Sequence, residues 1–236
     1  MSAIDIYLQV RREEGRLYAD DIVSQLPAVP ANHPLRAEWQ ARAASCDRLI
    51  QYLATLRRPF TMLELGCGNG WLANKVADAT GASVVGLDVN RTELSQAQRL
   101  FGARRNLAWI VADVTSPCFC GHAFDVVVMA SSIQYFADLS LLFQSLLGNL
   151  KHGGEIHILD SPFYPLEEVP AARERTRKYY AALGFPEMAN HYHHHTTAPL
   201  AEFNPDWLYV PQQHGRVENL VKDSPFPWVR LRPVRP

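Results

Sequence analysis

The chain has 236 residues, which is enough to bury one good hydrophobic core, and we expect a single main domain. Its 23 Lys and Arg residues against 24 Asp and Glu residues give a formal net charge of −1, which does not favour a nucleic-acid or membrane partner. The four cysteines lack a disulfide-framework spacing, and we find neither an apolar run of about 18 residues nor a signal-peptide pattern. We therefore expect a cytoplasmic protein.

The first part of the chain has a helical pattern. In segment 33–59 apolar residues recur at three- and four-residue steps, and Pro34 and Pro59 suit the first turn and the end of one helix. We interpret residues 1–58 as an N-terminal helical lid region, and residues 59–236 as the main domain.

From Phe60 onward short apolar runs alternate with helical patterns. Each run has the length of a strand buried on both faces, and the five runs are 61–65, 83–87, 107–112, 125–130 and 155–159. Asn90 predicts the N-cap of one intervening helix, with Glu93 three residues on. A second helix is predicted over 138–150, ending at the sequence "KHGG". Such alternation predicts an α/β fold with a doubly wound, mostly parallel sheet.

The C-terminal part of the sequence has a different pattern. In "WLYVP" and "PWVRLRPV" apolar and polar residues alternate, as they do in half-exposed antiparallel strands. We expect these two segments to form an antiparallel closing hairpin on the sheet edge. Between the fifth strand and this hairpin lies an insertion at about 161–204, which we interpret as a cap over the strand ends.

The sequence "LELGCGNG" places three glycines between the first strand and a helix. Such a loop brings a ligand against bare backbone and a helix N-terminus. A phosphate-binding P-loop needs a lysine directly after the last glycine, but Gly70 is followed by Trp71, so that reading fails. A dinucleotide-binding fingerprint needs glycine or alanine at position 71, so Trp71 weakens that reading without excluding it.

Three acidic residues mark the same edge of the predicted sheet. Glu64 lies inside the first strand, Asp88 ends the second, and Asp113 ends the third. Asp88 follows the glycines at close to the ~20 residues expected for an acid that binds ribose hydroxyls. Three carboxylates would repel a pyrophosphate and attract a ligand with a sulfonium, an ammonium and an adenine amino group. S-adenosylmethionine has all three groups.

The segment from Met62 to about Asp160 resembles the catalytic core of class I S-adenosylmethionine-dependent methyltransferases, of the methyltransferase-11-like small-molecule type. The resemblance lies in the ordered motifs "LELGCGNG", "VVGLDVN", "IVADV", "FDVVVMASSIQYF" and "LKHGGEIHILD". It implies a Rossmann-like methyltransferase fold. The cofactor-binding residues that it implies are Glu64, Gly66, Cys67, Gly68, Asn69, Gly70, Asp88, Val89, Asp113, Val114 and Ala130.

The resemblance also implies a role for most of these residues. The glycines would pack under the methionine part of the cofactor, and Glu64 would anchor the loop and the cofactor's amino group. Asp88 would bind both ribose hydroxyls and Asp113 the adenine amine. The two valines would flank the adenine, and the backbone of Ala130 would close the methionine side.

No catalytic residue can be assigned from the core, because transfer from a sulfonium mainly needs alignment and exclusion of water. Candidates therefore come from the ends of the fourth and fifth strands and from the cap: Ser131, Ser132, Gln134, Tyr135, Asp160, Tyr164 and the histidine cluster at 191–195. Of these we select Tyr164, His191, His193 and His194. A neutral histidine could act as the base for a hydroxyl acceptor. The clusters "CFCGH" and "HYHHH" lack the second half of a zinc site, so no metal site is predicted. Radical chemistry would need a cysteine triad that the spacing does not supply.

The sequence thus predicts a methyltransferase that uses S-adenosylmethionine and acts on an oxygen or nitrogen of a small-molecule acceptor. A non-catalytic protein that binds the same cofactor is the first alternative. A nicotinamide-dependent oxidoreductase on the same sheet is the second. No nucleic-acid or membrane partner is expected, whereas a protein acceptor stays open.

Overall fold

The computed structural model describes residues 2–116, 118–211 and 223–233, and within them the predicted doubly wound sheet is confirmed. The seven strands are arranged in the order β3-β2-β1-β4-β5-β7-β6. Their bounds are β1 Thr61–Leu65, β2 Ser83–Asp88, β3 Leu107–Val111, β4 Phe124–Ala130, β5 Leu150–Leu159, β6 Pro205–Tyr209 and β7 Trp228–Leu231. The first five strands pair in parallel, whereas β7 pairs antiparallel with both β5 and β6. The closing antiparallel pair is therefore confirmed, with its second strand on the inside.

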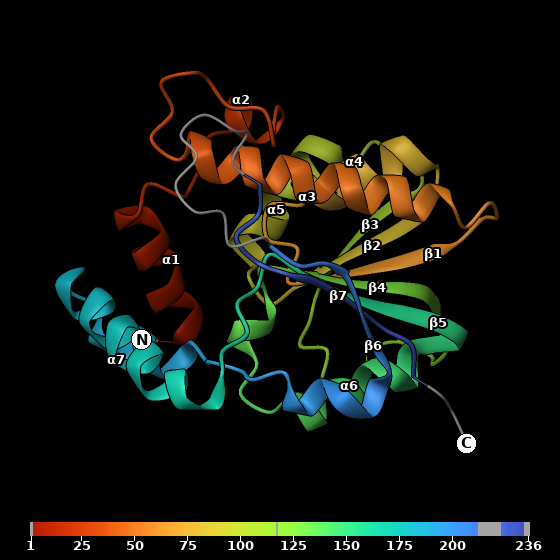
Figure 1. Cartoon of the computed structure of the whole chain (residues 1–236). Helices are drawn as coiled ribbons and strands as arrows, with labels where there is room; N and C mark the ends of the chain where they lie inside the picture. The colour runs from red at the N-terminus through yellow and green to blue at the C-terminus, as the bar shows by residue number, and fades with distance from the viewer. Residues whose placement is uncertain (1, 117, 212–222, 234–236) are drawn as a thin grey trace.

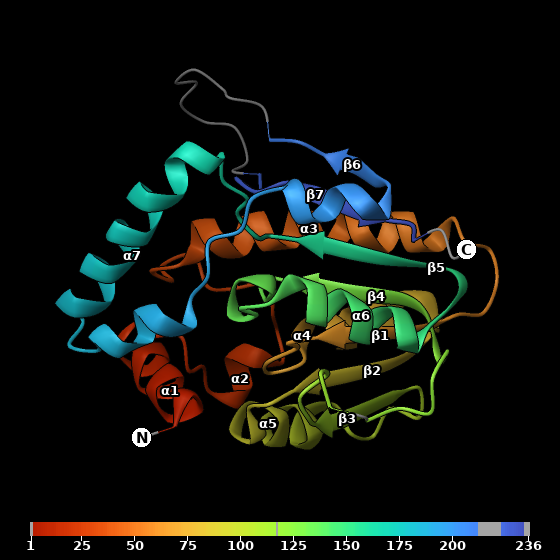
Figure 2. The same ribbon diagram turned by 90° about the horizontal axis from the view of Figure 1, so that it is seen from below.

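Helices cover both faces of the sheet (Figures 1 and 2). On one face lie α3 (Arg36–Ala54), α4 (Trp71–Thr80) and α5 (Arg91–Phe101), and on the other lies α6 (Leu139–Asn149). Each face has its own hydrophobic core, one containing Leu49 and Val76 and the other containing Leu142 and Phe143. These layers fix the strand ends, where the predicted site lies.

The predicted boundaries of two helices agree with the structure, whereas the segment that follows the second one differs. The Asn90 side chain accepts hydrogen bonds from the backbone of Thr92 and Glu93, so it caps α5 as predicted. The predicted end of α6 is also confirmed, because the helix ends at Asn149 with Leu150 as its C-cap, but the "KHGG" residues 151–154 lie inside the ten-residue strand β5. Gly154 there leaves room for Leu150, whose Cγ would lie 2.7 Å from a Cβ at position 154. These glycines therefore belong to a strand and do not end the helix.

A third group of elements lies beyond the carboxyl ends of the parallel strands (Figure 1). It contains α1 (Ala3–Glu13), α7 (Val169–Ala182) and the 3-10 helix η3 (Pro186–His191), which pack together around Val10, Tyr180 and Met188. The remaining elements are α2 (Asp20–Val23), η1 (Ile133–Tyr135), η2 (Leu166–Glu168) and η4 (Ala198–Phe203). The N-terminal segment thus divides, because α1 covers the strand ends while α3 packs on α4. Among the described helices none has the length and apolarity to cross a membrane.

Candidate cofactor site and active site

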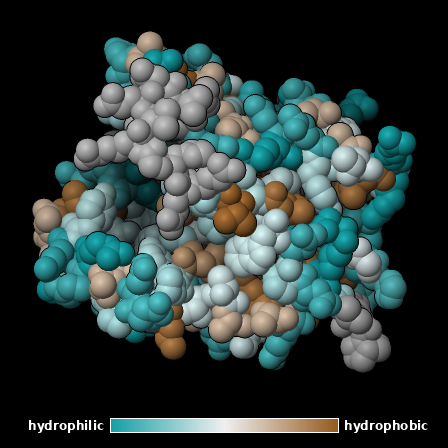
Figure 3. Space-filling view, in the orientation of Figure 1, coloured by the Kyte–Doolittle hydropathy of each residue, from teal (hydrophilic) through white to brown (hydrophobic). Residues whose placement is uncertain are grey.

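The carboxyl ends of the parallel strands surround a cavity of about 470 Å³. Its lining residues come from the segments that follow β1, β2, β3 and β4, and from α1 and η3 on the far side. The outer surface in the orientation of Figure 1 is hollowed on the left, at the level of the strand ends (Figure 3). A cavity of this size at this edge fits one bound small molecule.

The glycine loop is built for close approach. Gly66, Gly68 and Gly70 all adopt left-handed backbone conformations, with φ of 74°, 52° and 75°. A Cβ at Gly66 would lie 2.5 Å from the Cβ of Ser132, and one at Gly70 would lie 2.2 Å from the ring of Trp109. Gly66 and Gly68 line the cavity, whereas Gly70 makes room for the tryptophan ring behind the loop.

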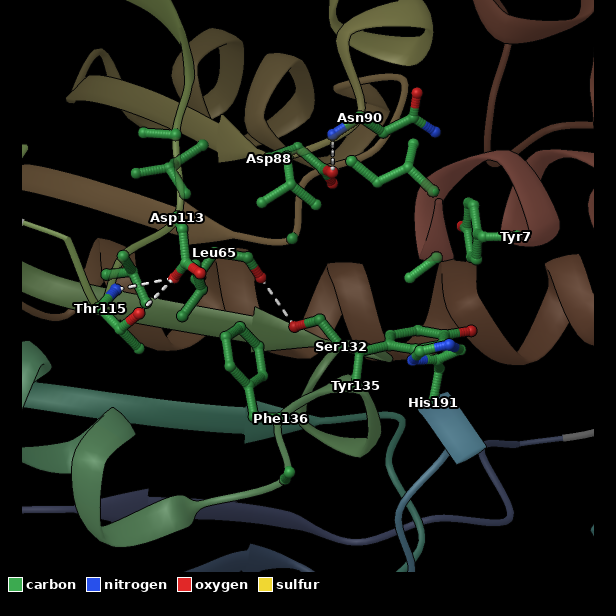
Figure 4. A pocket seen from close by; sticks show the side chains of 18 of the residues that line it. Tyr7, Leu65, Asp88, Asn90, Asp113, Thr115, Ser132, Tyr135, Phe136 and His191 are labelled. Atoms are coloured by element: carbon green, nitrogen blue, oxygen red, sulfur yellow. Dashed lines mark hydrogen bonds between the residues drawn. The ribbon is translucent and has the colours of Figure 1, made fainter. Parts of the chain in front are cut away.

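Asp88 connects the glycine loop to the next helix. Its carboxylate accepts hydrogen bonds of 2.8 Å from the backbone N–H groups of Gly68 and Asn90. Burial raises the pKa of Asp88 even though these donors favour the charged form. The carboxylate lines the cavity, and the close view shows it on the upper wall (Figure 4).

Two further carboxyl groups lie near Asp88, one on the buried residue Glu64 and one on the half-buried residue Glu93. Glu64 on β1 is only 3% exposed, and burial, with a smaller effect from the Asp88 charge, raises its pKa to about 8. Its Oε2 atom has no hydrogen-bond partner among the described residues. Burial and the charge of Asp88 likewise raise the pKa of Glu93 to about 7. A group of acids with raised pKa values and an unpartnered oxygen would be stabilised in its charged form by a nearby positive charge.

The residues that the sequence resemblance assigns to adenine also line the cavity. Asp113 lines it and accepts hydrogen bonds from the backbone and hydroxyl of Thr115, at 2.9 and 2.8 Å (Figure 4). Val114 is buried, whereas Val89 is 47% exposed, and both line the cavity. Together with Asp88 these residues form a wall with two carboxylates and an apolar surface between them.

Several predicted cofactor residues do not line the cavity. These are Glu64, Cys67, Asn69, Gly70 and Ala130. Burial raises the pKa of the Cys67 thiol, and its sulfur would lie 2.9 Å from a Cβ at Gly86. The Asn69 side chain accepts a long hydrogen bond of 3.4 Å from the backbone of Trp71. Cys67 and Asn69 therefore shape the loop around the cavity.

The wall opposite the acids is aromatic. Tyr7 of α1 and Tyr135 of η1 pack edge to face with ring centroids 5.6 Å apart, and His191 of η3 lies beside them in the lining (Figure 4). Arg11 lies 4.9 Å from the centroid of the Tyr7 ring and donates a 3.0 Å hydrogen bond to the Tyr135 hydroxyl. Sequence reasoning missed Tyr7 and Met188 as lining residues, because no spacing pattern links them to the strand ends.

The four catalytic candidates lie in different places. His191 lines the cavity, whereas Tyr164, His193 and His194 do not. His194 is 7% exposed, shares a 2.9 Å hydrogen bond with Thr176 and packs against Tyr164 at 5.3 Å between ring centroids. Burial lowers the pKa of both His193 and His194. Within the described ranges no group of His, Cys, Asp and Glu side chains could hold a metal ion.

Comparison with known proteins assigns this domain to a family. Residues 62–154 match the family model described as "Methyltransferase domain". Phosphoethanolamine N-methyltransferase 1 of Zea mays is 34% identical over 45% of this chain and 22% of its own length. The malonyl-[acyl-carrier protein] O-methyltransferase of Legionella pneumophila is 33% identical over 42% of this chain and 36% of its own length. Demethylmenaquinone methyltransferase of Thermus thermophilus is 32% identical over 52% of this chain and 54% of its own length. The chain thus spans between about a fifth and about half of the length of these relatives.

Solved structures show the same fold. The YcgJ protein of Bacillus subtilis has a TM-score of 0.56 at 16% identity and covers 70% of both chains. An S-adenosylmethionine-dependent methyltransferase from Methanosarcina mazei has a TM-score of 0.54 at 19% identity, over 75% of this chain and 94% of that one. Residues 62–154 therefore form a methyltransferase domain, and the chain shares its fold with these solved structures.

The residues present fit S-adenosylmethionine, the cofactor that a methyltransferase domain of this kind uses. S-adenosylmethionine carries two positive charges, on its sulfonium and its amino group, beside one carboxylate. The buried acids and the unpartnered oxygen of Glu64 provide an environment in which a cation is stabilised. Asp88 and Asp113 would bind the ribose and adenine groups, and the φ values of Gly66 and Gly68 leave bare backbone for the methionine part.

Proposed function

We propose that this protein is an S-adenosylmethionine-dependent methyltransferase that acts on an oxygen or nitrogen of a small-molecule acceptor. The observation that carries the proposal is the cavity at the strand ends, lined on one wall by Asp88 and Asp113 and on the other by Tyr7, Tyr135 and His191. The family match and the named relatives, which include N- and O-methyltransferases, support it. The net charge of −1 favours a small acceptor over a nucleic acid.

When bound, the cofactor supplies a methyl group whose C–S bond electrons return to sulfur while the acceptor's lone pair forms the new bond. The chain's own residues then have to bind the two substrates, align the acceptor atom with the methyl group, and exclude water from the site. Asp88 would orient the cofactor through the ribose hydroxyls. Glu64 would supply a compensating negative charge on losing the proton that its raised pKa retains. Helix α1 closes the cavity from outside through Ala3, Ile4 and Tyr7.

An acceptor hydroxyl or ammonium must also lose a proton. We propose His191 as the base, because it is the member of the histidine cluster that lines the cavity. Tyr164, His193 and His194 are second candidates, since they lie in the cap behind this wall. We further propose that residues 59–236 form the catalytic domain, with residues 161–204 as a cap and the cytoplasm as its location.

Titration calorimetry with S-adenosylmethionine tests the proposal directly. We expect the wild-type protein to bind, and Asp88→Ala to bind at least about ten-fold more weakly, because charge-assisted hydrogen bonds contribute about 1.5–3 kcal/mol. An absence of binding, or an unchanged affinity in Asp88→Ala, rejects the proposal.

Two measurements separate the alternatives. Incubation with S-adenosylmethionine and a small-molecule extract releases S-adenosylhomocysteine if the protein is an enzyme, and releases none if it only binds the cofactor. Reduced nicotinamide cofactors absorb near-ultraviolet light, so a change in that absorbance would reveal an oxidoreductase.

A further inference from the structure

A second cavity of about 460 Å³ lies between α3 and segment 223–226. Its lining includes Glu38 and Arg42 of α3, Asp160 after β5, and Ser131 after β4. Ser131 also lines the first cavity, so the two cavities have one wall residue in common. A methyl transfer needs two adjacent binding spaces, one for the donor and one for the acceptor.

The backbone between the two cavities is strained. Ser131 and Asp160 follow neighbouring parallel strands, and both adopt left-handed conformations, with φ of 55° and 50°. The Ser131 hydroxyl donates a 2.9 Å hydrogen bond to the carbonyl oxygen of Asp160, which joins the two strained residues. Such conformations cost about 1–3 kcal/mol each and gather at functional sites. The two left-handed residues therefore indicate that the wall shared by the two cavities has a functional role.

Asp160 differs from the other acids of the second cavity. Glu38 forms ion pairs with Arg16 and Arg42 at 2.6 and 3.1 Å, and Asp223 forms one with Arg48 at 2.8 Å. Asp160 has no basic partner among the described residues. Its Oδ1 accepts two 2.7 Å hydrogen bonds, from the hydroxyls of Ser45 and Ser224. Both serines are buried and come from opposite sides, so the carboxylate is held in place without being neutralised.

We propose that the second cavity is the acceptor site and that Asp160 binds a positively charged amino group of the acceptor. This inference rests on the proposed methyltransferase function and adds the substrate class, an amine-bearing small molecule. The fixed carboxylate supplies the charge complement, and the paired arginines leave no free cation beside it among the described lining residues. The ammonium serves as the anchor, while the reacting atom lies toward Ser131 and the first cavity.

The substrate class is tested with a small-molecule extract of the organism that supplies the gene, separated on a strong cation-exchange resin at pH ~2, where carboxylates are protonated and amino acids are retained together with other amines. Each fraction is incubated with the wild-type protein and S-adenosylmethionine, and S-adenosylhomocysteine is measured. We expect formation with the retained, cationic fraction and none above background with the unretained fraction. Formation with only the unretained fraction overturns the amine assignment and leaves the proposed function intact. Formation with neither fraction rejects the proposed function, and the acceptor site with it.

The role of Asp160 is tested with Asp160→Asn, which removes the charge and keeps a side chain that tolerates the left-handed conformation. We expect the amount of cationic fraction needed for half-maximal rate to rise about ten-fold or more, because hydrogen bonds to charged groups are strong. The affinity for S-adenosylmethionine and the Tm should stay unchanged. A matched control is Asp47→Asn, which removes an equal charge from an exposed position of α3.

A second variant tests the cavity independently of charge. Ala37 is exposed on α3 at the edge of the second cavity and does not line the first, so Ala37→Phe narrows only the second. We expect a higher half-saturating amount of the cationic fraction with unchanged cofactor binding. Wild-type acceptor kinetics in both Asp160→Asn and Ala37→Phe would overturn the proposal. So would a loss of cofactor affinity equal to the loss of acceptor affinity, since that result indicates a structural role.

Discussion

At the scale of single residues, three acids near the glycine loop connect cofactor binding to the stability of the fold. Glu64, Asp88 and Glu93 are close enough for the charge of Asp88 to raise the pKa values of the other two, after the larger effect of burial. The folded protein therefore keeps carboxyl groups in surroundings where their charged forms are costly. A cationic ligand removes that cost, which links cofactor binding to stability.

Glu64 makes the free protein less stable at alkaline pH. Its folded pKa is about 8, against an ordinary value of 4.5, so between these values the folded state holds a proton that the unfolded state has lost. The contribution of Glu64 to stability therefore declines as pH rises from about 4.5 to 8. Glu64→Gln should remove this decline and raise the Tm at pH ~9 by several degrees. Thermal unfolding of the wild type and the variant, below pH ~4.5 and at pH ~9, measures this difference in Tm. An equal Tm of the two proteins at the higher pH would contradict the prediction.

Substitution of His191 tests whether this residue is the general base that takes a proton from the acceptor. We expect His191→Ala to lower turnover about a hundred-fold, the usual contribution of general base catalysis, while the affinity for S-adenosylmethionine holds. His152→Ala serves as a control, because His152 is exposed and lies on β5 outside the cavity. A larger loss of turnover in His193→Ala or His194→Ala would assign the general base to that residue of the cap instead. Uniformly small losses of turnover would contradict a histidine base.

At the scale of elements, the starts of three parallel strands are tied together by Asp125. Its carboxylate accepts hydrogen bonds from the backbone and hydroxyl of Thr61 at 2.8 and 2.9 Å. Arg58 and Lys151 approach it at 2.7 and 2.8 Å. These contacts connect β1, β4 and β5 at the end of the sheet opposite the site. They outweigh burial and hold the pKa of Asp125 well below its usual range.

We expect Asp125→Ala to lower the free energy of unfolding by about 2–4 kcal/mol, because it leaves a backbone donor and two cations without their partner. The folded pKa is depressed, so the stabilisation by Asp125 is complete above the unfolded pKa and is lost as pH falls toward the folded one. Urea unfolding measures the effect. Asp78→Ala is the control, since its pair with Arg104 is exposed and should contribute less than about 1 kcal/mol.

At the scale of the whole molecule, α1 has to lie over the cofactor cavity although it contributes little to the main cores. It is held by polar contacts to η1 and α7: Arg11 donates a 3.0 Å hydrogen bond to the Tyr135 hydroxyl, and the Tyr179 hydroxyl donates one of 2.7 Å to Glu14. Arg11 also pairs with Glu14 at 3.0 Å. One arginine therefore links the lid helix to the strand-end wall.

Loss of this link should open the cavity. We expect Arg11→Met to weaken binding of S-adenosylmethionine about ten-fold, corresponding to about 1.4 kcal/mol, and to speed amide hydrogen exchange along α1. Arg12→Met is the matched control, because Arg12 is exposed in the same last turn of α1. Unchanged exchange in Arg11→Met would show that apolar packing alone holds the helix.

The sequence predicted those parts of the molecule that depend on local pattern. The five parallel strands, the cap at Asn90 and the acids at the strand ends follow from short-range periodicity and spacing. The loop glycines were also predicted, but the reason for Gly70 was not, because Trp109 reaches it from another strand. Tyr7, Met188 and the second cavity depend on packing between distant segments, which a single sequence does not encode in any local pattern.

The position of β7 between β5 and β6 bears on how the nascent polypeptide matures. Strand β6 leaves the ribosome first, yet among the described strands its sole neighbour is β7, which is made later. Translation therefore delivers these two strands in the reverse of the order in which they can dock. Until β7 has been synthesised, one edge of β5 has unpaired backbone hydrogen-bonding groups. We expect a chaperone to bind the chain mainly during that interval.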